Sequence, residues 1–173
     1  MKMNSTALAC ATAAVLVMAL TGCTSVKLQA NKDQAAVRKV NRMFLLIQHG
    51  DLGEQSYSND LADALRNAFT NTPVVVDVGI MNPVELDERI HLQRIDSFGA
   101  DSVMVIKATG GVLSPYGGGY PTIIYDASLF EPTLNKRLWR ARIDNSGGTA
   151  LMKRRMREMA ERIINQLKTD GFI

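Results

Sequence analysis

Met43-Phe44-Leu45-Leu46-Ile47 is the stretch that decides the fold, because it places large apolar side chains in a row without a polar interruption. Such a run predicts a strand that is buried on both faces, as in parallel sheets that are covered by helices. The run lies within residues 40–48, which we assign to the first strand of an α/β domain.

The next segments alternate between helix and strand. Residues 58–69 carry an apolar stripe at helical spacing, with Ser58 or Asn59 as the expected cap. Residues 74–78 and 101–108 are rich in β-branched and other apolar residues and are predicted as two further strands. Between them, Asn82-Pro83 signals the start of a kinked helix, or of two short ones, that ends at Gly99.

The carboxyl-terminal part predicts a hairpin followed by a long helix. Residues 122–130 and 138–143 alternate apolar and polar side chains and form two antiparallel strands, with Trp139 expected in the core. Residues 149–168 are the best helix of the chain. The predicted fold is therefore a single α/β domain over residues 40–173, with one mixed sheet, the order β-α-β-α-β-β-β-α and helices packed on the sheet.

Composition supports a globular domain. The chain has 173 residues, of which 46% are hydrophobic and 21% charged, and a formal net charge of +3. These values exclude a disordered chain and give little support to nucleic-acid binding, which needs a concentrated basic face. We expect no nucleic-acid partner.

The first 22 residues read as a signal peptide. Lys2 precedes a nearly continuous apolar run over residues 7–20, which is too short to span a membrane but fits the core of a signal peptide. Leu20-Thr21-Gly22-Cys23 then resembles the lipobox of bacterial lipoproteins. By that resemblance, Cys23 becomes the first residue and carries acyl chains such as palmitate. The alternative is an ordinary signal followed by an incidental cysteine.

The predicted anchor also predicts a location. Two or three acyl chains hold a protein on a membrane, whereas a single chain does so only marginally. Thr24, which is not an aspartate, resembles lipoproteins that Gram-negative bacteria forward to the outer membrane. We expect a protein anchored in the outer membrane and facing the periplasm; a Gram-positive source would change the sorting and keep the anchor. Residues 23–39 are polar and weakly patterned and are predicted as a tether.

Two further motifs resemble a group of bacterial envelope proteins. Gly99-Ala100-Asp101 leads into an apolar strand, and Ile124-Tyr125-Asp126 precedes a turn and Leu138-Trp139. This pattern is similar to that of the curli-secretion lipoprotein, the lipoprotein activators of penicillin-binding proteins and the amino-terminal domain of the Tol-Pal propeller protein. The chain departs from these families because it has no room for membrane-spanning hairpins and no long linker. The resemblance implies an accessory role in the cell envelope.

A search for catalytic chemistry finds little. His49 and His91 are far apart in the sequence and have no cysteine or second histidine beside them, so no metal site is expected. The chain has neither a phosphate-binding glycine motif nor a Gly-x-Ser-x-Gly elbow. We therefore predict a protein that is not an enzyme and has no cofactor.

The remaining candidates are surfaces for contact. Residues 109–121 form a glycine-rich loop in which Leu113, Tyr116 and Tyr120 could anchor a partner or another copy. Arg140 and Arg142 could contact anionic lipid or glycan. For each candidate the alternative is a mere connection or a solvated face.

The sequence thus predicts a lipid-anchored periplasmic accessory or assembly factor of a cell-envelope complex that acts through protein–protein contacts, as a homo-oligomer or with a protein partner. The alternative is a binding module for a small molecule or glycan, with a pocket near His49.

Overall fold

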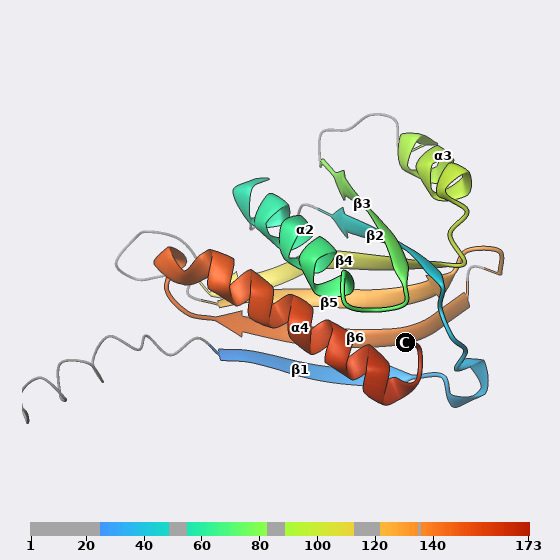
Figure 1. The fold of residues 1–173 in the computed structure, drawn as a ribbon. Coiled ribbons are helices and arrows are strands. Elements are labelled where there is room, and N and C mark those ends of the chain that lie inside the picture. Colours follow the sequence, from blue (N-terminus) through green and yellow to red (C-terminus); the bar gives the residue numbers. More distant parts are fainter. Residues whose placement is uncertain (1–24, 49–54, 83–88, 113–121, 135) are drawn as a thin grey trace, which may run out of the picture.

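A single mixed sheet of six strands forms the domain, with helices on both of its faces (Figure 1). The structure is a computed structural model and describes residues 25–48, 55–82, 89–112, 122–134 and 136–173. Its elements are β1 (Ser25–Lys32), η1 (Gln34–Ala36), β2 (Arg42–Gln48), α2 (Gln55–Phe69), β3 (Val75–Met81), α3 (Arg89–Phe98), β4 (Ser102–Val112), β5 (Thr122–Glu131), β6 (Lys136–Ser146), η2 (Thr149–Leu151) and α4 (Met152–Asp170). The predicted α/β class and the predicted order from β2 onward are confirmed.

The strand order explains where the helices lie. Across the sheet the order is β1-β6-β5-β4-β2-β3, with β2 parallel to both β3 and β4 and all other pairs antiparallel. The chain moves from β2 outward to β3 and then back past β2 to β4. Because parallel crossovers are right-handed, these two opposite steps place α2 and α3 on opposite faces of the sheet.

The central strand β2 is buried on both faces, as predicted. Met43, Leu45 and Ile47 belong to the main core beneath α2 and α4. Phe44 and Leu46 point to the other face, where they form a smaller cluster with α3. The alternation of side chains along a strand makes one apolar run serve two cores.

The main core is closed by α4. Its apolar stripe is fully buried and includes Met156, Met159, Ile163 and Leu167. Trp139 on β6 is 1% exposed, which confirms the predicted core position. Its indole Nε1 donates a hydrogen bond of 2.8 Å to Oδ2 of Asp170, the last residue of α4. This bond ties the end of the helix to the sheet.

The predicted tether is wrong over much of its length. Residues 25–32 form strand β1, which pairs antiparallel with β6 in a continuous register from Ser25 opposite Ser146 to Lys32 opposite Trp139. Val26 is buried in the main core, and Leu28 packs against it. The segment therefore gains backbone hydrogen bonds to β6 along its whole length and buries part of its apolar surface. The domain begins no later than Ser25, rather than at Val40.

Several element boundaries also differ from the prediction. Helix α2 already includes Gln55, so Ser58 lies inside the helix and is not its cap; the added turn carries Tyr57, which packs against the core. Strand β4 extends to Val112, with a register shift between Ala108 and Gly110, so the predicted loop begins later than residue 109. The expected start of the next helix at Pro83 lies outside the described residues, and α3 ends just before Gly99, as predicted.

The Gly-Ala-Asp turn has a clear structural role. Gly99 has a positive φ of 67°, a conformation that favours glycine and lets the chain leave α3 sharply. Oδ2 of Asp101 then accepts hydrogen bonds from the backbone N–H groups of Asn41 (2.9 Å) and Arg42 (3.2 Å). The turn fixes the start of β2 beside the start of β4.

Candidate interaction surface

One face of the sheet is left without a helix over β1, β6, β5 and part of β4, as far as the described residues show. Helices α2 and α4 cover the opposite face, and α3 lies on this face against β2, β3 and the first part of β4. Side chains alternate along each strand, so the uncovered side displays the polar positions. We call this surface the open face; it consists of Gln29, Asn31, Lys107, Thr109, Asp126, Ser128, Arg140 and Arg142.

The register places charged side chains in a row across the open face. Gln29, Arg142, Asp126 and Lys107 are direct neighbours on β1, β6, β5 and β4. On the next level, Asn31 lies opposite Arg140. The carboxylate of Asp126 therefore has cations on both flanking strands, an arrangement that favours cross-strand attraction.

Both arginines predicted as interaction residues lie on this face. Nη2 of Arg140 contacts Oδ2 of Asp126 at 2.8 Å, and Nε of Arg142 contacts Oδ1 of Asp144 at 3.2 Å. The arginine side chains are nevertheless 54% and 57% exposed. Exposed ion pairs of this kind contribute only about 0.2–1 kcal/mol each. These ion pairs therefore contribute little to the stability of the domain.

The open face is also hollowed. A shallow depression of about 380 Å³ is lined by Gln29, Ala30, Asn31, Thr109, Asp126, Arg140 and Arg142. Sequence analysis missed the contribution of β1 because it assigned this segment to a tether. The alternation of Val26, Leu28 and Ala30 with Lys27, Gln29 and Asn31 was the signal that could have revealed the strand.

The other predicted site residues lie outside the described part of the chain. Leu113, Tyr116 and Tyr120 fall within residues 113–121, and Cys23 falls within residues 1–24. His49, near which a pocket was expected, falls within residues 49–54. These predictions are therefore not tested by the structure.

The second histidine is part of the fold. His91 on α3 is 5% exposed and lies against β3, since its Nδ1 would come within 3.2 Å of a Cβ placed on Gly79. Within the described ranges, no three histidine, cysteine, aspartate or glutamate side chains are grouped in a way that could hold a metal ion. None of the described helices has the length and apolar character of a membrane span.

A buried arginine fixes the end of the sheet at which β6 leads into α4. Arg155 is fully buried; its Nε donates to Oδ1 of Asn145 at 2.8 Å, its Nη1 donates to the carbonyl of Gly147 at 2.6 Å, and its Nη2 donates to the carbonyl of Asn145. Burial lowers the pKa of Arg155 and raises that of the neighbouring Tyr125. The guanidinium holds the first turn of α4 against the end of β6.

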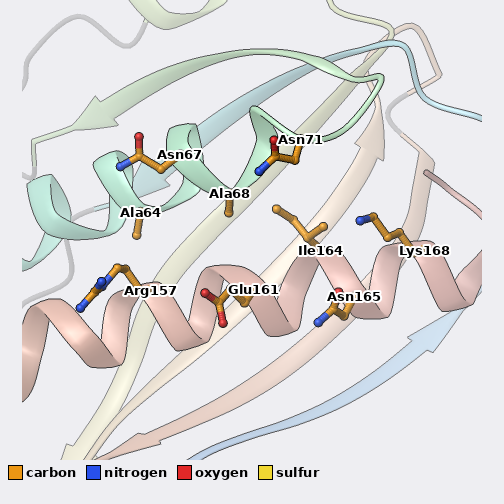
Figure 2. Close-up of a pocket in the computed structure, with 9 residues that line it drawn as sticks. All are labelled: Ala64, Asn67, Ala68, Asn71, Arg157, Glu161, Ile164, Asn165 and Lys168. Carbon is orange, nitrogen blue, oxygen red and sulfur yellow. The ribbon is translucent and has the colours of Figure 1, made fainter.

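A second depression lies between the two helices on the opposite face. Its volume is about 350 Å³. Ala64 and Ala68 of α2 point toward α4, and Ile164 of α4 points back toward α2, so the small alanines let the helices approach closely (Figure 2). The remaining lining residues are polar or charged and comprise Asn67, Asn71, Arg157, Glu161, Asn165 and Lys168. This groove offers space to a small ligand, as does the depression on the open face.

Comparison with known proteins identifies solved structures with a similar fold but does not assign the chain to a family. The chain matches no protein-family model and no curated protein. Among solved structures, it is similar to the PelC dodecamer from Paraburkholderia phytofirmans, with 13% identity over 86% of this chain and 99% of that chain and a TM-score of 0.55. The two chains share a fold.

Two further structures are similar to this chain. A PelC variant dodecamer from Paraburkholderia phytofirmans has 13% identity, covers 83% of this chain and 98% of its own, and has a TM-score of 0.53. A protein from Xanthomonas campestris is more distant, with 10% identity, 84% and 93% coverage and a TM-score of 0.47. The resemblance to the curli-secretion, synthase-activator and Tol-Pal proteins stays a prediction.

Proposed function

We propose that this chain is a lipid-anchored accessory or assembly protein of the bacterial cell envelope that acts through protein contacts, first of all with copies of itself. In this proposal, acylated Cys23 holds the domain on the outer membrane and the domain faces the periplasm. The observation that carries the proposal is the open face, a charged and hollowed surface of the sheet without helix cover in the described residues.

Two arguments support self-assembly, one from the fold and one from the charges of the open face. The proteins with which the chain shares its fold include PelC, which forms a dodecamer, so the fold is compatible with a large homo-oligomer. Soluble homo-oligomers close through complementary patches on each subunit. The open face offers both signs of charge, in Arg140 and Arg142 on one strand and Asp126 on the next, and so can pair with a neighbour of either sign.

Self-assembly can be tested on a soluble chain that starts at Thr24. Light scattering during size-exclusion chromatography measures its mass. We expect the wild type to be an oligomer and Arg142→Glu to shift it toward the monomer, because the substitution reverses the charge that this position would offer to a carboxylate of the neighbouring copy. Arg162→Glu is the matched control, since Arg162 is a half-exposed arginine that pairs with Glu158 on α4, away from the open face.

Two results would contradict this part of the proposal. A wild-type chain that stays monomeric at tens of micromolar would refute self-assembly. An Arg142→Glu variant that assembles like the wild type would remove the open face from the interface. Unchanged circular dichroism spectra of both variants would exclude misfolding as the cause.

The anchor has its own test. Cys23→Ser removes the sulfur that would be acylated, so the full chain should leave the outer-membrane fraction and keep its signal or be released. A variant that still sediments with outer membranes after a high-salt wash would show that Cys23 is not the anchor. Mass spectrometry of the wild-type amino-terminal peptide would show the acyl chains directly.

A second candidate function is binding of a small molecule or glycan, and the groove between α2 and α4 is the observation that favours it. Amide side chains of Asn67, Asn71 and Asn165 line it beside charged Arg157 and Glu161, and such groups hydrogen-bond to hydroxyls. Native mass spectrometry of the purified protein distinguishes the candidates. A retained glycan or lipid favours this function, whereas co-purifying protein favours assembly.

A further inference from the structure

One end of the sheet gathers segments that are far apart in the sequence. Ser25 at the start of β1 lies opposite Ser146 at the end of β6, Ser146 lies opposite Thr122, and Thr122 lies opposite Val112 at the end of β4. Helix α4 starts shortly after β6, so its first turn is at the same end (Figure 1). We call this the anchor end and define it by Ser25, Val112, Thr122, Ser146 and the first turn of α4.

The start of β1 lies very close to Cys23 along the chain. Only Thr24 separates Cys23 from Ser25. An extended chain spans at most about 3.6 Å per residue, so Cys23 lies within roughly 7 Å of the anchor end whatever its conformation. A tether up to residue 39 would have allowed the domain to stand well away from the membrane, but β1 removes that freedom because it is paired along its whole length.

We infer that the anchor end lies directly against the lipid head groups and that strands β1, β5 and β6 extend from this end away from the membrane surface. This inference rests on the proposed acylation of Cys23. The turn between β5 and β6 then lies at the far end, about 35 Å away, since β6 has 11 residues at roughly 3.3 Å each.

The side chains at the anchor end suit a lipid surface. Val112 is 58% exposed and offers an apolar contact. Lys27, Lys153 and Arg154 are exposed cations. Asp144 lies opposite Lys27 on β6 and is paired with Arg142. Lysine and arginine reach head-group phosphates with the charged tip while their stems cover apolar surface. Within this end, Arg155 ties the first turn of α4 to the end of β6.

Single-cysteine labelling tests the orientation on the full, anchored chain. Cys10 leaves with the signal and the sulfur of Cys23 is acylated, so an added cysteine is the one free thiol of the mature protein. Val112→Cys places a fluorophore at the anchor end, and Leu134→Cys places it at the far end. The two positions are matched, because both carry apolar side chains that are 58% and 69% exposed.

The labelled proteins are reconstituted in vesicles of phosphatidylethanolamine and phosphatidylglycerol with spin-labelled head groups. We expect severalfold stronger quenching at position 112 than at position 134, and the reverse order with iodide in the water. Equal quenching at both positions, with protein that floats with the vesicles, would overturn the orientation and leave the anchor intact. Protein that does not float would refute the proposed acylation and this inference together.

Discussion

Trp139→Phe tests whether the bond between β6 and the end of α4 stabilises the domain. The indole of Trp139 is buried, and its Nε1 donates to the partly buried Asp170 carboxylate at 2.8 Å. A hydrogen bond to a charged group contributes about 1.5–3 kcal/mol. Phenylalanine also leaves a void of ~40 Å³, which at ~24 cal/mol per Å³ costs ~1 kcal/mol. The expected loss in the free energy of unfolding is therefore about 2.5–4 kcal/mol, close to the ~3–5 kcal/mol expected for Trp139→Ala.

The assay is urea unfolding of the soluble chain that starts at Thr24, followed by far-ultraviolet circular dichroism. Fluorescence is unsuitable because Trp139 is the single tryptophan of the chain. A loss of about 3 kcal/mol lowers the melting temperature by roughly 6–12 °C for a domain of this size. The total stability of such domains is about 5–15 kcal/mol, so the variant should still fold.

A double-mutant cycle with Asp170→Asn separates the hydrogen bond from the void. If the bond carries most of the effect, Trp139→Phe should cost about 1–2 kcal/mol less in the Asp170→Asn background than in the wild type. A loss below about 1 kcal/mol in the single variant, or equal losses in both backgrounds, would refute the reasoning.

Three further predictions concern stability. Partial burial raises the pKa of Asp170, but hydrogen bonds from Gln166, Trp139 and Lys32 outweigh it and hold the pKa below its ordinary value. The stabilisation by the ionised carboxylate is therefore present above about pH 4 and is lost as the pH falls further. Urea unfolding should show that the stability difference between wild type and Asp170→Asn shrinks below about pH 4. Gly171→Ala should lower stability by about 1 kcal/mol or more in thermal unfolding, because Gly171 ends α4 with a φ of 90° and an added Cβ would lie 3.2 Å from Val37. Gly79→Ala should cost about 1–3 kcal/mol, since its Cβ would lie 3.0 Å from the buried ring of Phe44; an unchanged melting temperature would show that the ring can move aside.

Much of the domain could be predicted from local pattern. The apolar run at Met43–Ile47 predicted a doubly buried strand, the alternation around Trp139 predicted a hairpin with a buried indole, and both are confirmed. These predictions succeeded because burial on a strand depends on side chains that lie close together in the sequence. The outward orientation of Arg140 and Arg142 could be predicted for the same reason, since polar positions that alternate with buried ones face away from the core.

The candidate surface as a whole could not be predicted in this way. Local sequence pattern was enough to predict the α/β class and the core faces of the strands, and to identify a cysteine placed as in lipoproteins. The partner of Ser25–Lys32 is a matter of tertiary structure: the segment alternates like a strand, but its ladder is made with β6, more than a hundred residues later in the chain. That pairing brings Gln29 and Asn31 beside the arginines and places Ser25, two residues after Cys23, at the end of the sheet. Contacts between distant segments depend on the register of the whole sheet, which no local pattern contains.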